Sequence, residues 1–227
     1  RIACDLVRRD AVYYATRGPA AEALARELAL RRRAGIGGRW LTPGGLRRLT
    51  GIPGRGAIVT RGNAQFDPYR ASLGLLRHAA ADGALVFERT PVRRIEQRRG
   101  GVRLVTPHGS IAAREVVVAT GYAVPGFEPL VGRFGMRHTY VIATPPVTAS
   151  QASEIGFGDV MAWDTERPYH YLRWTPDRRL LIGGADRPLL PGRRRAGALA
   201  AAVRELKDHF DRLLPALADI RVDRAWE

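Results

Sequence analysis

The stretch Glu115-Val-Val-Val-Ala-Thr-Gly-Tyr122, followed by Ala123-Val-Pro-Gly-Phe127, decides how the rest of the chain is interpreted. Three β-branched residues in a row are typical of a strand buried on both faces, as in a parallel sheet. The run ends at Thr120 and Gly121, and a glycine can turn sharply or lie against a ligand because it carries no Cβ. In open α/β sheets, ligands collect at the carboxyl ends of strands. The stretch therefore indicates either a strand end that contacts a ligand or a core strand that merely turns.

The residues before this stretch predict a helix, a short strand and a meander. Asp67 is placed to cap a helix that begins at Pro68 and ends near Asp82, before Gly83. We expect a short strand at 84–88 after it. The meander strands are expected at 91–97, 102–106 and 110–119.

The remaining segments predict a second, mostly antiparallel sheet covered by helices 19–34 and 197–214, whose apolar residues recur at helical spacing. A short helix is expected from Thr42 to Gly51, and 149–159 is expected to be a loop. Strands are expected at 12–16, 57–60, 139–144, 160–163, 169–174, 180–184 and 220–226.

The turn Thr175–Arg178 predicts a hairpin, whose strands place their side chains alternately on two faces. Side chains of a strand point alternately to its two faces. We therefore expect Tyr169, Tyr171 and Arg173 on one face, and His170, Leu172 and Trp174 on the other.

Composition narrows the class of protein. The net charge of the 227 residues is +15, which leaves a basic nucleic-acid-binding domain as an alternative. A solvated basic surface is favoured, because the arginines are scattered and no RNA-binding aromatic signature accompanies them. No apolar run approaches the roughly 18–20 residues of a membrane span. Cys4 is the only cysteine, which excludes an internal disulfide and indicates a reducing, cytoplasmic compartment.

The chain offers no clear acid–base or metal-ligating set. Its five histidines are dispersed along the sequence, and none pairs with Cys4 at ligand spacing. We therefore predict no metal site, and we assign no catalytic residue.

Three segments together resemble a known family. They are FDPYRASLGLLRHAAADGALVFERTPVRRIEQ (66–97), GVRLVTPHGSIAAREVVVATGYAVPGF (101–127) and YHYLRWTPDRRLLIGGAD (169–186). In this order they resemble the D-amino-acid-oxidase-like family of FAD-dependent oxidoreductases. That family includes glycine and sarcosine oxidases, D-amino-acid dehydrogenases and γ-glutamylputrescine oxidases.

The resemblance implies an α/β fold of two interleaved parts. Residues 1–64 and 128–227 would form a substrate domain, and 65–127 would form the distal part of a Rossmann-like FAD-binding domain. The chain begins at Arg1 and contains no G-x-G-x-x-G, so we expect a fragment of a longer protein. Such a fragment would be inactive, would not retain FAD, and would self-associate through exposed sheet edges.

The resemblance also implies roles for particular residues. Val92 matches the residue that meets the adenine through its backbone, and the segment Ala119-Thr120-Gly121 matches the one that passes close to the dinucleotide. Arg173 matches an arginine that pairs with a substrate carboxylate, as the guanidinium fork allows. Tyr171 and Tyr169 would line the same pocket.

The implied activity is oxidation of the C–N bond of a small-molecule amino acid or amine, with hydride transfer to FAD. An NAD(P)-dependent oxidoreductase is a further alternative. The substrate and the electron acceptor stay open at this point.

Overall fold

The computed structural model describes residues 1–121, 133 and 135–227. Residues 122–127 of the opening stretch lie outside this described part. The chain divides into two compact units, each described by itself below. One unit comprises residue 1, residues 3–68 and residues 137–227, and the other comprises residue 2 and residues 69–136.

The first unit is built on an eight-stranded sheet in the order β11-β7-β10-β9-β8-β1-β3-β2. Its strands are β1 (Val7–Ala15), β2 (Arg39–Leu41), β3 (Gly56–Gln65), β7 (Arg137–Ala143), β8 (Val160–Asp164), β9 (Tyr171–Trp174), β10 (Leu180–Pro188) and β11 (Arg224–Trp226). Only β1 and β8 pair in parallel, and the other neighbours are antiparallel. The mostly antiparallel sheet is confirmed, although β2 was not expected.

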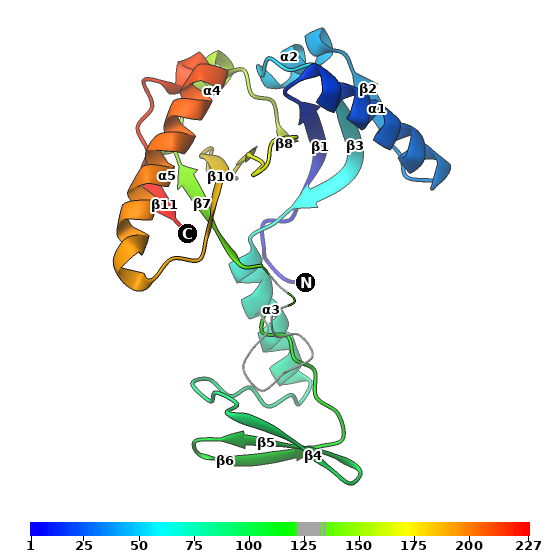
Figure 1. Ribbon diagram of the computed structural model, residues 1–227, viewed down its shortest axis with the longest axis vertical. Coiled ribbons are helices and arrows are strands. Elements are labelled where there is room, and N and C mark those ends of the chain that lie inside the picture. The colour runs from blue at the N-terminus through cyan, green and yellow to red at the C-terminus, as the bar shows by residue number, and fades with distance from the viewer. Residues whose placement is uncertain (122–132, 134) are drawn as a thin grey trace. The chain divides into compact units, whose positions relative to one another are not determined.

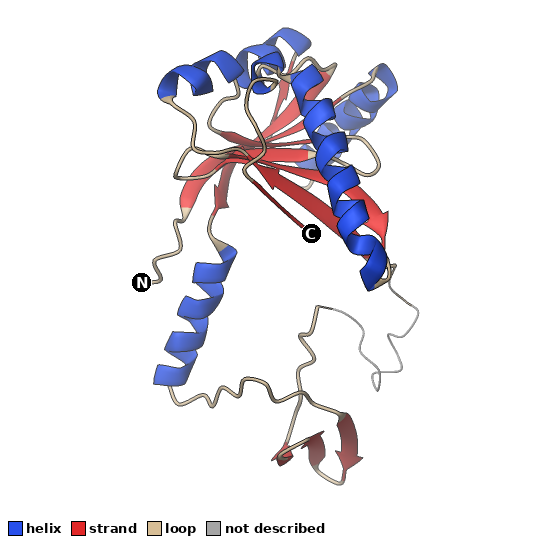
Figure 2. Cartoon of the chain, turned by 90° about the vertical axis from the view of Figure 1, so that its left-hand side faces the viewer, coloured by secondary structure: helices blue, strands red, loops and turns tan. Residues whose placement is uncertain are grey.

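Different helices cover the two faces of this sheet. The helices of the unit are α1 (Gly18–Arg33), α2 (Pro43–Thr50), α4 (Ala149–Ile155) and α5 (Gly192–Leu213), followed by a 3-10 turn, η2 (Pro215–Leu217). Helix α5 packs on β10, β7 and β11, whereas α1 packs on β1, β2 and β3 at the other end of the sheet (Figure 1). Figure 2 shows α5 running along the sheet. No described helix is long and apolar enough to cross a membrane.

Strand alternation explains why the helices take opposite faces. Tyr14 of β1 belongs to the larger core, together with Leu172 and with Phe210 of α5. Its neighbour Ala15 points the other way and packs with Leu24 of α1. On the α1 face, strands β8, β9 and β10 carry no helix within the described part of the unit. Their side chains on that face are half-buried.

Local capping signals set several helix ends. Thr42 caps α2 by accepting the N–H of Gly45 at 3.2 Å, and Gly51 ends that helix with φ of 70°. The loop expected at 149–159 is wrong for residues 149–155, because Thr148 and Gln151 form a capping box that starts α4. A capping box followed by a glycine was the signal that the sequence analysis missed.

The second unit contains α3 (Pro68–Ala81) and a three-stranded antiparallel meander of β4 (Arg94–Arg98), β5 (Gly101–Thr106) and β6 (Gly109–Ala113). The helix, whose first residue belongs to the first unit, and the meander are confirmed. The strand expected at 84–88 is wrong, and so is the buried strand expected after Glu115. Val117 is 88% exposed. A strand needs a neighbour for its backbone hydrogen bonds, and the described residues of this unit hold no sheet besides the meander.

The β8–β9 connection is held by the buried carboxylate of Asp164, which is 0% exposed. Its Oδ1 accepts the backbone N–H groups of Glu166 at 2.9 Å and of His170 at 3.0 Å. Its Oδ2 lies 2.8 Å from Nδ1 of His170. The His170 ring stacks on His209 of α5 at a centroid distance of 4.1 Å. The histidines are dispersed along the sequence, but the fold brings these two together.

Asp164→Ala should lower the free energy of unfolding by about 3 kcal/mol or more. The substitution leaves the backbone N–H groups of Glu166 and His170 without their acceptor. Asp164→Asn should cost less, since an amide oxygen can still accept both backbone N–H groups. Urea unfolding measures both variants. Asp219→Ala, at an exposed aspartate, is the control and should leave stability unchanged. Equal stability of Asp164→Ala and the control would contradict the role of Asp164.

The lowered pKa of His209 should make the stability of the fold depend on pH. Burial lowers the pKa of His209 below its ordinary value of 6.5, and His170 lowers it further. The unfolded chain then binds a proton more readily than the folded chain. The contribution of His209 to the free energy of unfolding is therefore full above about pH 6.5 and is lost as the pH falls below that value. Unfolding at pH 7.5 and pH 5 should show this loss, and His209→Phe should reduce it. The same pH dependence in both proteins would rule out His209 as its source.

Candidate functional site

Three aromatic side chains form a row across the sheet on its α1 face. Tyr13 of β1 pairs directly with Trp163 of β8, which pairs with Tyr171 of β9. The rings of Tyr13 and Trp163 stack at 5.7 Å with 23° between their planes. All three side chains are half-buried. Residues that pair directly across strands point to the same face, which is why the row is continuous.

Gly183 of β10 continues this row and makes room for it. It pairs with Tyr171, and a Cβ at this position would lie 2.1 Å from Cζ of that tyrosine. The ring of Tyr171 therefore lies over the backbone of β10. A larger residue at position 183 would displace the ring.

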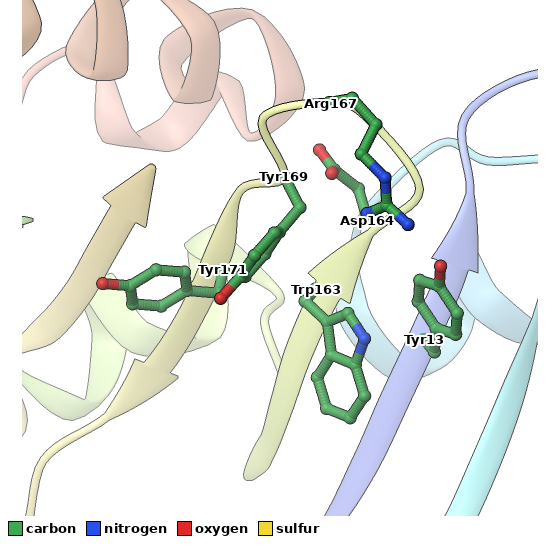
Figure 3. Close-up of a pocket in the computed structure, with 6 residues that line it drawn as sticks. All are labelled: Tyr13, Trp163, Asp164, Arg167, Tyr169 and Tyr171. Atoms are coloured by element: carbon green, nitrogen blue, oxygen red, sulfur yellow. The ribbon is translucent and has the colours of Figure 1, made fainter. Parts of the chain in front are cut away.

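A cavity of about 420 Å³ opens over the row (Figure 3). It is lined by Tyr13, Trp163, Asp164, Arg167, Tyr169 and Tyr171. Arg167 and Tyr169 come from the β8–β9 connection that Asp164 holds, and Figure 3 shows both reaching toward the cavity from above. The rings of Tyr169 and Tyr171 lie 5.9 Å apart. Four aromatic rings and one guanidinium thus surround an open, largely apolar space.

Arg173 lies two residues beyond Tyr171 on β9 and on the same face. It pairs with Met161 of β8 and Leu181 of β10. Burial lowers its pKa, and Asp67 raises it, but a guanidinium stays charged in proteins. Its Nη1 lies 3.5 Å from the carbonyl oxygen of Trp174, at the limit of a hydrogen bond. No ion pair joins it to any residue that the structure describes.

The structure therefore brings the predicted Arg173, Tyr171 and Tyr169 to one place. The sequence analysis missed four further residues that line the cavity, namely Tyr13, Trp163, Asp164 and Arg167. Tyr13 and Trp163 lie on strands that were expected. Only the parallel pairing of β1 with β8 makes them neighbours, and no local pattern encodes that pairing.

The residues predicted to bind the cofactor lie in the second unit. Val92 is 49% exposed and precedes β4, whose ladder begins where the N–H of Arg93 donates to Val105 at 2.8 Å. Ala119 and Thr120 are exposed, and Gly121 has φ of 75°. Only glycine adopts that backbone angle freely. The cofactor role of these four residues stays a prediction.

One cluster of possible metal ligands lies on the other face of the sheet. The donor atoms of Asp164, His170 and His209 lie within 4.8 Å of one another. The two rings are nearly parallel, with 15° between their planes, so their in-plane lone pairs do not converge on one ion. Asp164 Oδ2 is also already bonded to His170. This geometry favours hydrogen-bonded packing over a metal centre.

A larger cavity, of about 510 Å³, lies beside α2. It is lined by Thr16, Pro43, Gly44, Arg47, Pro53, Gly54 and Arg55. Thr16 already donates its hydroxyl to Glu166. The cavity has no aromatic wall and does not adjoin Arg173, so the aromatic cavity is the better candidate site.

Comparison with known proteins places this geometry in a family. The sequence profile of the family described as "FAD dependent oxidoreductase" matches residues 1–227. A probable oxidoreductase, OrdL, of Rhizobium meliloti is 27% identical over 173 residues, covering 74% of this chain and 38% of that protein. The glycine oxidase of Bacillus subtilis is 26% identical over 183 residues, covering 75% of this chain and 44% of that protein. The chain thus spans less than half the length of these relatives.

Solved structures show the same fold. The glycine oxidase of Geobacillus kaustophilus matches 99% of this chain with a TM-score of 0.75 and 22% identity, over 59% of its own length. The L-proline dehydrogenase of P. horikoshii matches 99% with a TM-score of 0.78 and 16% identity, over 61% of its length. Because the family profile covers every residue, the chain belongs to the family of FAD-dependent oxidoreductases named DAO, whose cofactor is FAD.

Proposed function

We propose that the complete protein oxidises the C–N bond of an amino acid or an amine, with transfer of a hydride to FAD. The observation that carries the proposal is Arg173, a half-buried guanidinium that makes no ion pair in the described part of the chain, although Asp67 is an acidic neighbour. It lies beside an aromatic cavity on a sheet face that no described helix covers. The similar proteins named glycine oxidase and iminodiacetate oxidase support the same class of substrate.

Arg173 is suited to bind the substrate carboxylate. A guanidinium donates two parallel hydrogen bonds to a carboxylate, which fixes the position and the orientation of the substrate. Partial burial strengthens such a contact, because water competes less for both groups. In the proposed reaction Arg173 therefore holds the substrate, and FAD, when bound, supplies the hydride acceptor.

Tyr171 is better suited to donate a hydrogen bond than to accept a proton. Burial raises the pKa of its hydroxyl, and the neighbouring Tyr169 raises it further. The phenol therefore stays protonated at neutral pH and can donate to a substrate oxygen. The rings of the cavity also exclude water from bound substrate. No residue of the described chain is assigned as a general base.

The chain carries features that fit part of an FAD site. On the α1 face of β8, β9 and β10 no described helix covers the sheet, so a planar ring can approach it beside Arg173. We also propose that Val92 and Ala119-Thr120-Gly121 contact the dinucleotide, with residues 65–127 forming the distal part of the FAD-binding domain. Residues 1–64 and 128–227 would then form the substrate domain.

Two further proposals concern the chain in the cell and in solution. A cytoplasmic location is proposed because Cys4 is a free thiol. Self-association of the isolated chain is proposed through its sheet edges, where the outermost strands β2 and β11 are unpaired on one side. Both edge strands are only three residues long, so we expect the association to be weak.

Arg173→Ala in the complete protein should lower kcat/KM for a carboxylate substrate by about 30- to 1000-fold. The bound FAD content should change little. Steady-state kinetics and the flavin absorbance spectrum measure the two effects. Arg39→Ala, at an exposed strand arginine, is the matched control. A loss below about threefold would mean that Arg173 does not hold a carboxylate.

The 227-residue chain, purified alone, should be colourless and inactive. It contains no G-x-G-x-x-G turn to bring helix N–H groups onto the pyrophosphate. A few backbone contacts of about 1 kcal/mol each do not offset the roughly 4–15 kcal/mol cost of association. The absorbance spectrum after gel filtration measures retention. A flavin band near one equivalent per chain would contradict this expectation.

A further inference from the structure

We propose that the aromatic cavity is a subsite for the large, uncharged, aromatic side chain of the amino-acid substrate. This inference rests on the proposed function and goes beyond it by naming a substrate class. It also separates amino acids with such a side chain from glycine and from cationic amines.

The walls favour a flat apolar group. Tyr13, Trp163, Tyr169 and Tyr171 present four aromatic rings to a space of about 420 Å³. Aromatic pairs prefer stacked or tilted contacts of the kind already present between Tyr13 and Trp163. Glycine would leave this space filled with water. An aromatic side chain would remove both its own surface and that of the rings from water.

The charged groups at the cavity favour an uncharged side chain over a cationic one. The carboxylate of Asp164 accepts three hydrogen bonds from Glu166 and His170, so it is already occupied. Arg167 is exposed and makes no ion pair with any residue that the structure describes. A positive group in the cavity would lie next to this guanidinium and be repelled. A planar ring, in contrast, can stack against it.

The distance between Arg173 and the cavity matches the length of an amino acid whose side chain carries a ring. Tyr171 lines the cavity, and Arg173 lies two residues further along the same face of β9. Two residues of a strand span about 7 Å. A substrate whose carboxylate is bound by Arg173 can therefore extend its side chain over Tyr171 toward Trp163 and Tyr13.

The test uses the complete, FAD-loaded protein and follows anaerobic reduction of the flavin. The substrates are glycine, phenylalanine and lysine, the last two as both enantiomers. Phenylalanine, in its better enantiomer, should exceed glycine in catalytic efficiency by about 10- to 100-fold, from burial of the ring. Lysine should fall at least about tenfold below phenylalanine. Glycine equal to phenylalanine, or lysine equal to phenylalanine, would overturn the subsite.

Variants identify the residues responsible. Trp163→Ala should remove most of the preference for phenylalanine over glycine. Arg167→Glu, at an exposed residue, should raise the efficiency with lysine relative to phenylalanine by about tenfold or more. Arg39→Glu is the matched control and should leave the ratio unchanged. An unchanged lysine-to-phenylalanine ratio in Arg167→Glu would remove Arg167 from the subsite.

A binding measurement separates this inference from the proposed function. Calorimetry compares acetate with 3-phenylpropionate, neither of which carries an amine to be oxidised. 3-Phenylpropionate should bind at least about tenfold more tightly, and Trp163→Ala should abolish the difference. If no amino acid or amine reduces the flavin, the proposed function fails, and this comparison alone decides the subsite. Equal affinity for both acids would overturn the subsite even if amino acids are oxidised.

Discussion

The parallel pairing of β1 with β8 is the contact on which the rest of the first unit depends. It joins two strands that lie far apart in the sequence in one register, with Tyr13 beside Trp163. All other strand pairs of this sheet are antiparallel, so this pairing unites what would otherwise be two separate antiparallel sheets, β11 to β8 and β1 to β2. It also assembles the aromatic row, because each half of the sheet supplies one part of it. The stability of the sheet and the shape of the candidate site therefore have the same origin.

One side of the β8–β9 connection packs against α5, and the other side faces the candidate site. On the α5 side, Asp164 binds His170 within the connection, and the His170 ring stacks on His209 of α5. On the opposite side, Arg167 and Tyr169 of the same connection reach over the cavity. A hydrogen-bonded anchor beneath the connection thus positions side chains above it. Arrangements of this kind let a rigid scaffold position exposed binding groups on a loop.

Sequence patterns predicted the elements that depend on interactions between residues close together in the chain. Helices with an apolar stripe, the hairpin and the meander all appear, and the alternation that places Tyr171 and Arg173 together is confirmed. The Val116-Val-Val118 run shows the limit, because β-branched residues form a strand only where a neighbouring strand accepts their backbone hydrogen bonds. Tyr13 and Trp163 show the same limit for the site. Their proximity depends on a strand pairing across most of the chain, which no short-range signal contains.

The environment of Arg173 connects the fold to the proposed chemistry. A half-buried guanidinium that makes no ion pair is unfavourable for folding, since burial removes water that would solvate the charge. Elsewhere in the same unit, Arg179 forms ion pairs with Asp177 and Asp223. The same fold thus contains an arginine that is paired within the chain. Pairing Arg173 in the same way would occupy the donors that a substrate carboxylate needs. The proposed role of Arg173 gives a reason for an arginine that is partly desolvated and makes no ion pair beside an aromatic cavity, because the donors of a guanidinium match a carboxylate that binds from outside the chain.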